Sequence, residues 1–169
     1  TALTPLILIF VVFIKQVIEL LYSNKFTEIT GMIEWIMLGM LFRAISWSIS
    51  FAFVAQGDSK TFFWNELLSN VYSIFFSILG YWWLGLTGLG IGFLLTYFVY
   101  TVQMVLLASS KFKFSFNSDF LKVLLTQLVI CIIGFSIIKL IGDNLLRYLF
   151  GGVFIVFSTF ISLKELNKM

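Results

Sequence analysis

Histidine is absent from this 169-residue chain, which also has only one cysteine and one proline. Without histidine the protein lacks the commonest general base and a frequent metal ligand. The single cysteine, Cys131, lies in an apolar run and can form neither an internal disulfide nor a metal cluster. We therefore expect no metal cluster, and we also predict no cofactor, no catalytic residue and a protein that is not an enzyme.

Charge is also scarce, because only 11% of the residues are charged, against roughly 25% in soluble globular domains. Hydrophobic residues make up 60% of the chain, which includes 21 phenylalanines and 5 tryptophans, and the mean hydropathy is +1.05. Such a chain needs lipid, detergent or a partner around it, and its aromatic residues suit contact with membrane lipids and interfacial anchoring. The net charge is +3 and the basic residues are scattered singly, so we expect no nucleic-acid partner.

Long apolar runs account for most of the sequence. A helix needs roughly 20 apolar residues to cross a bilayer. Six runs approach or exceed that length, at about residues 2–22, 29–55, 61–84, 90–108, 120–141 and 145–163. Turn-forming residues separate several of them, including QGDSK at 56–60 and a glycine-rich stretch at 85–90. The sequence therefore predicts an all-α fold, a polytopic membrane bundle of about six transmembrane helices.

The distribution of basic residues predicts which links face the cytoplasm. Six of them fall on one side of the predicted spans: Lys60, Lys111, Lys113, Lys122, Lys164 and Lys168. Four fall on the other side: Lys15, Lys25, Lys139 and Arg147. The positive-inside rule places the first group, the link at 109–119 and the C-terminus in the cytoplasm. The chain starts at Thr1, so we expect it to be cut from a longer protein, and we expect the polar end at 164–169 to be a true C-terminus.

One arginine lies in the middle of the second span, where a charge costs several kcal/mol on insertion scales. Arg43 would share a helix face with Ser46, Trp47 and Ser50, four residues at helical spacing. This face predicts either an aqueous cavity that accepts an anionic group such as a phosphate, or an ion pair with a carboxylate from another helix. Glu34 falls on the opposite face near the membrane boundary, where we expect it to be solvated.

The third span carries a polar stripe at spacings of three and four, namely Glu66, Asn70, Ser73, Ser77 and Tyr81, with Ser69 on the same side. A polar face on an otherwise apolar helix predicts a hydrated groove, or else helix packing through small polar residues. The fourth span has small residues at Gly88, Gly92 and Thr96, which favour close helix packing, and Tyr100 and Gln103 extend its polar face. In the fifth span, Gln127, Cys131 and Gly134 share a face that we expect to be packed. The candidate substrate-binding residues are therefore Arg43, Ser46, Ser50, Glu66, Asn70, Ser73 and Ser77.

Three segments give the chain a family resemblance. VIELLYSNKF lies at 17–26, AFVAQGDSKTFFWNELLSN at 52–70 and LGLTGLGIGFLLTY at 84–97. Their order resembles the C-terminal half of the O-antigen translocases, polysaccharide flippases of the multidrug/oligosaccharidyl-lipid/polysaccharide exporter superfamily. Lys60 and the glycines at 85–92 match turns of that family, and the resemblance covers about residues 5–108.

The resemblance implies the C-terminal lobe of a MATE-like flippase fold, which has about twelve to fourteen helices in two lobes around a central cavity. Residues 1–108 would be four helices of that lobe, and 109–169 two additional helices with a short cytoplasmic tail. The partners would be the N-terminal half of the same transporter and a lipid-linked oligosaccharide in the bacterial inner membrane. The resemblance carries over no site residue, so Arg43 and Glu66 are candidates from their place in the spans alone.

The function expected on these grounds is the flipping of an undecaprenyl-diphosphate-linked oligosaccharide across the membrane by alternating access. Arg43 would contact the diphosphate, and the stripe that begins at Glu66 would contact sugar hydroxyls or a coupling ion. A multidrug or ion antiporter, with Glu66 as the coupling carboxylate, is the first alternative. A membrane-embedded enzyme that acts on lipid-linked sugars is the second, although no link exceeds about a dozen residues.

Overall fold

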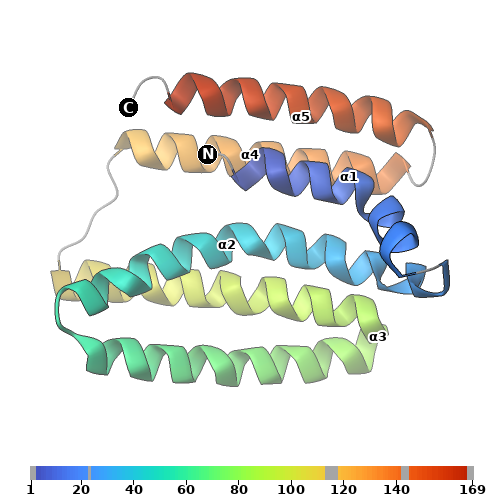
Figure 1. The fold of residues 1–169 in the computed structure, drawn as a ribbon. Helices are drawn as coiled ribbons and strands as arrows, with labels where there is room; N and C mark the ends of the chain where they lie inside the picture. Colours follow the sequence, from blue (N-terminus) through green and yellow to red (C-terminus); the bar gives the residue numbers. More distant parts are fainter. Residues whose placement is uncertain (1–2, 23, 113–117, 142–144, 167–169) are drawn as a thin grey trace. The chain divides into compact units, whose positions relative to one another are not determined.

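The structure is a computed structural model that describes residues 3–22, 24–112, 118–141 and 145–166. The described chain is helical, with no strand in these ranges, and five of its helices are long and apolar enough to cross a membrane. The elements are α1 (Leu3–Leu21), the short 3-10 helix η1 (Asn24–Ile29), α2 (Thr30–Ala55), α3 (Ser59–Phe112), α4 (Ser118–Ile141) and α5 (Leu145–Leu166) (Figure 1). The helices form two compact units: α1, α4 and α5 belong to unit 1, and α2 and α3 to unit 2.

A tight turn joins the two helices of unit 2. Gly57 has a φ of 81°, and its N–H donates to the Val54 carbonyl at 3.0 Å. The N–H of Asp58 donates to the Phe53 carbonyl at 2.9 Å, so the last carbonyls of α2 are satisfied as in a Schellman motif. The side chain of Asp58 then accepts from the N–H of Thr61 at 3.2 Å and caps the start of α3. The turn predicted at residues 56–60 is thus confirmed.

The 54-residue helix α3 doubles back on itself at Gly85. Gly85 has φ 59° and ψ −137°, a conformation that favours glycine strongly because it has no Cβ. The two arms, residues 59–84 and 86–112, run antiparallel (Figure 1). Near the bend the arms approach at backbone distance, since a Cβ at Gly88 would collide with the carbonyl of Gly80 and a Cβ at Gly92 would lie 2.6 Å from the Phe76 carbonyl oxygen. The close packing predicted from the small residues of this stretch is therefore confirmed.

The helix α2 packs along this hairpin and completes unit 2. Gly90 of the second arm lies against the backbone of Met32, so α2 also approaches α3 through a glycine. Phe53, Tyr100 and Met104 are fully buried in the resulting core. Glu34 is only 7% exposed, so the expectation that it lies in a solvated interface is wrong. It lies one turn into α2 and is enclosed by the packing of that helix within the unit.

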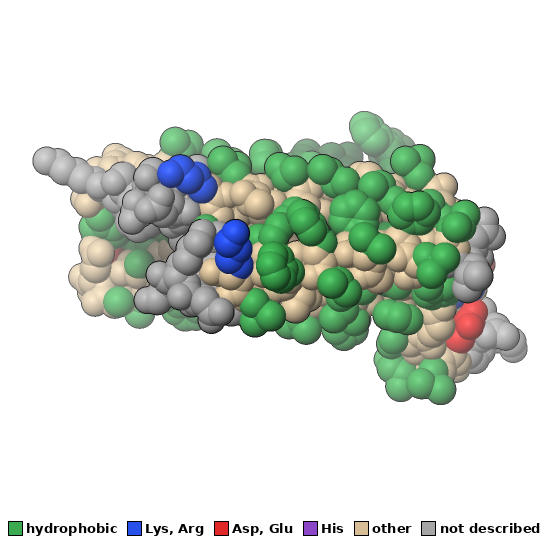
Figure 2. Space-filling view, turned by 90° about the horizontal axis from the view of Figure 1, so that it is seen from above, with side chains coloured by type: hydrophobic (Ala, Val, Ile, Leu, Met, Phe, Trp, Pro, Cys, Tyr) green, Lys and Arg blue, Asp and Glu red, His purple; other side chains and the backbone are tan. Residues whose placement is uncertain are grey.

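In unit 1 the helices α1, α4 and α5 pack against one another. Leu8, Cys131 and Ile138 are completely buried in its core, and Gln127 of α4 donates to the hydroxyl of Ser162 of α5 at 3.2 Å. A Cβ at Gly134 would lie 2.9 Å from Leu8 Cδ2, so the packed face predicted for α4 is confirmed. Figure 2 shows hydrophobic side chains over the middle of the face that it draws, with charged side chains nearer the ends, as a helix in lipid requires.

The sequence places the apolar helices well, but the compact units group them differently from the expected division. The second predicted span, 29–55, differs from α2 by one residue at its start, and the fifth and sixth differ by two or three residues at one end. The compact units join α1 to α4 and α5, although α1 is distant from them in sequence. The expected links at 113–117 and 142–144, and the tail at 167–169, lie outside the described residues.

Candidate functional site

A carboxylate with two hydroxyl donors lies inside unit 2. Glu66, on the first arm of α3, accepts a hydrogen bond from the Tyr100 hydroxyl of the second arm at 2.5 Å. Its Oε1 also accepts from the Ser50 hydroxyl of α2 at 3.1 Å, and the hydroxyls of Ser50 and Tyr100 are themselves 3.1 Å apart. Tyr100 and Ser50 are buried, and Glu66 is half-buried. The three helical segments of the unit are thus joined at one polar point.

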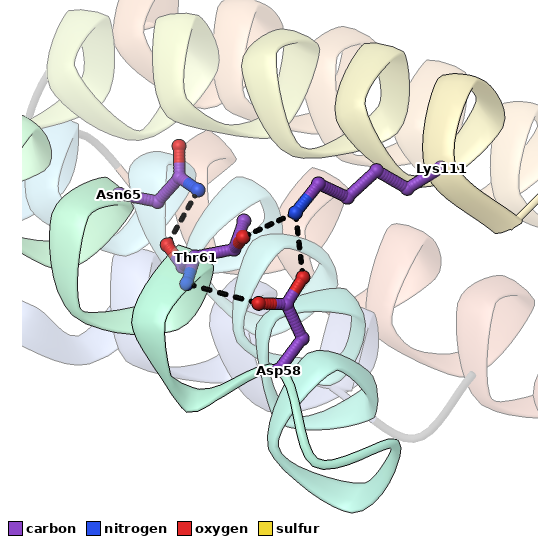
Figure 3. A network of polar contacts seen from close by, with 4 residues as sticks. All are labelled: Asp58, Thr61, Asn65 and Lys111. Carbon is purple, nitrogen blue, oxygen red and sulfur yellow. Dashed lines mark hydrogen bonds and ion pairs between the residues drawn. The ribbon is translucent and has the colours of Figure 1, made fainter.

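From this point, polar side chains follow the seam between the two arms of α3 toward the turn that joins α2 and α3. Gln103 donates to Asn65 Oδ1 at 2.5 Å, and Asn65 donates to the Thr61 carbonyl at 2.7 Å. Lys111 then donates to the Thr61 hydroxyl at 2.5 Å and forms an ion pair with Asp58 at 2.6 Å (Figure 3). We call these residues, from Glu66 to Lys111, the polar column: Ser50, Asp58, Thr61, Asn65, Glu66, Tyr100, Gln103 and Lys111.

At the turn between α2 and α3, the polar column ends in two partly exposed charged residues, Asp58 and Lys111. The side chains of Asp58 and Lys111 are 27% and 44% exposed. Hydrogen bonds from Lys111 and then from Thr61 lower the pKa of the Asp58 carboxyl below its ordinary value. The ion pair places residues 58 and 111 at the same end of unit 2, in agreement with the grouping of Lys60 and Lys111 on one side.

Arg43 lies in a bracket of aromatic rings. Its guanidinium carbon is 4.3 Å from the centroid of the Trp47 ring, 5.3 Å from that of Tyr97 and 5.9 Å from that of Phe93. These are cation–π distances. The Nε atom is buried and has no hydrogen-bond partner, and within the described parts of the chain Arg43 makes no ion pair with a carboxylate. The guanidinium therefore keeps its hydrogen-bonding capacity for another group.

The remaining candidates on α2 are not equally available. Ser46 is completely buried, and its hydroxyl donates to the backbone carbonyl of Arg43 at 3.0 Å, so it packs within the helix bundle. Ser50 is only 1% exposed and belongs to the polar column. Trp47 is 42% exposed beside Arg43. The predicted face thus divides into a buried edge with the two serines and an accessible edge with Arg43 and Trp47.

The stripe on the first arm of α3 divides in a similar way. Glu66 turns toward the other helices, Ser73 and Ser77 are half-buried, and Asn70 is exposed. Ser69 is only 7% exposed, which removes it from the accessible side. Within the described residues, the side chains of Asn70, Ser73 and Ser77 form no hydrogen bond with another group. They leave a polar border on unit 2 beside the packed face, where a ligand's hydroxyl groups would find partners.

Sequence reasoning missed the pairing of Asn65 with Gln103 and of Asp58 with Lys111. Tyr100 and Gln103 were recognised as a polar face, but no partner was assigned to them. A signal was present, because Thr61 and Asn65 are four residues apart on one helix and Tyr100 and Gln103 three apart on the next. A tight hairpin brings its two helices close enough for such faces to pair.

The described residues contain no group of three histidine, cysteine or acidic side chains that would hold a metal ion. The chain matches no protein-family model, no curated protein and no solved structure. The arrangement of the site is therefore the basis for any functional conclusion.

Proposed function

We propose that this chain is part of a membrane transporter that moves a lipid-linked oligosaccharide, carried on undecaprenyl diphosphate, across the bacterial inner membrane. The observation that carries the proposal is Arg43 in its aromatic bracket. A guanidinium in an apolar helix bundle, without a carboxylate partner among the described residues, has unused donors that suit an anion. A diphosphate offers the pairs of oxygens that a planar guanidinium binds best.

The lipid carrier and the sugar would use other features of unit 2. The exposed hydrophobic side chains of its helices suit a lipid tail that stays in the bilayer during transport. The polar border at Asn70, Ser73 and Ser77 would offer hydrogen bonds to sugar hydroxyls. Such a protein changes the position of its ligand and breaks no covalent bond. It would act together with the N-terminal half of the same transporter, as the C-terminal lobe of a MATE-like fold.

An ion or drug antiporter is the second candidate, because Glu66 lies in a membrane helix and accepts hydrogen bonds from two hydroxyls. Carboxylates within membrane helices mark ion pathways in membrane proteins. The two candidates differ in the charge of the group that is recognised. An anionic substrate requires Arg43, whereas a cationic one requires Glu66.

Variants of Arg43 in the full-length transporter test the proposal through the display of surface polysaccharide. Arg43→Lys should reduce the display of polysaccharide, because a single ammonium replaces the planar guanidinium that can bind two phosphate oxygens at once. Arg43→Ala should abolish the display. The melting temperature in detergent should change little, because in the described structure the alanine variant loses ring contacts worth about 1 kcal/mol and leaves no carboxylate unpaired. Normal display by Arg43→Ala would remove this residue from the substrate path.

Arg147 offers a matched control for this experiment. It is an arginine inside unit 1 that is only 5% exposed, and its Nη2 donates to the Val11 carbonyl at 2.6 Å. Arg147→Ala should therefore lower the melting temperature, because it removes a buried hydrogen bond of a charged group, worth roughly 1.5–3 kcal/mol. Of these two alanine variants, only Arg43→Ala should lose polysaccharide display while it keeps a normal melting temperature.

The transport proposal includes six membrane crossings, with each arm of α3 counted as one and the C-terminus in the cytoplasm. In a Cys131→Ser background, Lys60→Cys should then be labelled by an impermeant thiol reagent only from the cytoplasmic side, and Leu84→Cys only from outside. The two sites lie near opposite ends of one arm, roughly 36 Å apart at 1.5 Å per residue. Labelling of both positions from the same side would contradict six crossings.

A further inference from the structure

The first arm of α3, residues 59–84, exposes a continuous apolar face (green in Figure 1). Most of the exposed side chains follow one another at spacings of three and four residues, so they share one side of the helix. We call them the outer face: Leu67, Leu68, Val71, Ile74, Phe75 and Ile78. The structure describes every residue of this stretch, and the one exposed polar side chain in it, Asn70, belongs to the polar border.

An exposed tryptophan lies at each end of the outer face. Trp64 precedes it and is 58% exposed, whereas Trp82 follows it and is 79% exposed. Residues 64 and 82 are separated by about five turns of 3.6 residues, so both indoles lie on the same side of the helix. Each has an aromatic neighbour: Phe63, whose ring centroid is 5.8 Å from that of Trp64, and Trp83, which is 76% exposed. We call the pairs Phe63–Trp64 and Trp82–Trp83 the two belts.

The spacing of the belts matches the thickness of a bilayer. Trp64 and Trp82 are roughly 27 Å apart at 1.5 Å per residue, close to the hydrocarbon thickness of about 30 Å. Side chains on a helix all tilt toward its N-terminus, so the spacing of the rings follows that of the backbone. Tryptophan concentrates at the membrane–water interface because its ring is apolar and its N–H is polar. The Asp58–Lys111 ion pair lies beyond one belt and the bend at Gly85 beyond the other, where lipid head groups would be.

The composition of the outer face favours lipid over a further helix as its neighbour. Membrane helices pack on one another through small residues, and on the first arm these lie on the opposite side. Gly80 meets Gly88 of the second arm at backbone distance, and Ser69 is buried. The outer face itself has only bulky aliphatic and aromatic side chains. Such side chains hold a second backbone at a distance, whereas acyl chains fit around them.

From this geometry we propose that the outer face of the first arm is a lipid-binding surface that contacts phospholipid over the full thickness of the bilayer. The acyl chains cover the outer face, and the two belts lie at the head-group level of the two leaflets. Because tilt would shorten the separation of the belts across the membrane, the arm stands close to the membrane normal. The inference concerns the lipid around the protein and does not depend on which ligand is transported.

The two belts also give Arg43 a depth in the membrane. Ser50 of α2 contacts Glu66 of the first arm, and the two helices run antiparallel from the turn that joins them (Figure 1). Arg43 lies seven residues before Ser50, so it is level with the residue seven positions after Glu66. That residue is Ser73, which is halfway between Trp64 and Trp82. The guanidinium therefore lies near the midplane of the bilayer.

Collision rates of nitroxide labels test the lipid contact. The full-length protein, with Cys131 and any other cysteine replaced, is labelled at Ile74→Cys on the outer face and reconstituted in phospholipid vesicles. Lys60→Cys is the control, because Lys60 is exposed and lies beyond the Phe63–Trp64 belt. Electron paramagnetic resonance then measures collisions with oxygen, which concentrates in hydrocarbon, and with a water-soluble nickel chelate.

The label at residue 74 should collide often with oxygen and rarely with the nickel chelate, and the label at residue 60 should show the reverse. Rare collisions with both reagents at residue 74 would mean that the N-terminal half of the transporter or a second copy covers the outer face. Frequent collisions with the nickel chelate there would place the face in water. Either result would overturn the proposal.

Tryptophan fluorescence tests the depth of the belts. The emission lost in a Trp82→Phe, Trp83→Phe double variant belongs to the indoles of one belt, and the emission lost in Trp64→Phe belongs to the other. In both cases this emission should be quenched more by phospholipids brominated near the glycerol end of the acyl chain than by those brominated near the methyl end. Equal or stronger quenching by the deep bromines would overturn the assignment of that belt to the head-group level.

Discussion

Alanine at Gly88 should force the two arms of α3 apart. A Cβ at this position would collide with the backbone carbonyl of Gly80, and the collision is reciprocal for a Cβ at Gly80. The obstacle is backbone, so no side chain can rotate away, and the arms must separate along the seam. Overpacking of this kind costs about 1–3 kcal/mol, and the rigid obstacle favours the upper end of that range. The gain in helix propensity from glycine to alanine returns roughly 0.5–1 kcal/mol.

The net effect should be a loss of about 2 kcal/mol, or about 4–8 °C in melting temperature for a chain of this size. Thermal unfolding of the purified protein in detergent measures it. The matched control is Gly152→Ala on α5, where an added Cβ meets nothing within 4 Å and should leave stability unchanged or slightly raised. Because one separation of the arms relieves both collisions, Gly80→Ala combined with Gly88→Ala should cost less than the sum of the two. A Gly88→Ala protein as stable as Gly152→Ala would refute the close packing of the hairpin.

Two other perturbations test the polar column. Tyr100→Phe removes a hydroxyl that donates to Glu66 and should cost about 1.5–3 kcal/mol in thermal unfolding, whereas Tyr97→Phe, whose ring faces Arg43, should cost much less; equal losses would contradict the assigned hydrogen bond. The Asp58 carboxyl has a folded-state pKa below its ordinary value of 3.8, mainly because of the hydrogen bond from Lys111. Its contribution to stability is therefore fully present well above pH 3.8 and is lost as the pH falls from there through the folded-state pKa. Asp58→Asn should therefore weaken the fall of the melting temperature at acidic pH. If the melting temperature of the variant falls with acid as much as that of the wild type, the pH dependence comes from other groups.

The apolar helices could be predicted closely because hydropathy is a local property. Each helix is a run of residues long enough to cross a bilayer, and turn-forming residues such as Gly57 mark where it ends. The glycine-rich stretch at 85–90 was recognised as a connection, and Gly85 supplies the positive φ that the bend needs. Gly85 interrupts the helical backbone of α3, so its two arms correspond to two of the predicted spans.

Contacts between side chains of different helices could not be predicted. The sequence shows which residues share a face of one helix, but it does not show which other helix packs against that face. Arg43 was a candidate for a cavity or for an ion pair, and the three aromatic rings that surround its guanidinium come from residues that its own helix face did not reveal as a set. Ser46 shares the face of Arg43 in projection, yet it is buried while the neighbouring Trp47 is exposed. A difference of one residue position turns a side chain by about 100°, enough to move it from the packed side to the open side.

The sequence by itself determined that this protein is a set of apolar helices with a few polar side chains inside them. Composition alone excludes a hydrated surface, and the spacing of the turns sets the length of each helix. Only the tertiary structure decided that Glu66 meets Ser50 and Tyr100, and that Lys111 returns to Asp58, 53 residues away in sequence. These contacts depend on the direction in which α3 folds back and on how closely its glycines let the arms approach, and both are properties of packed backbones in three dimensions.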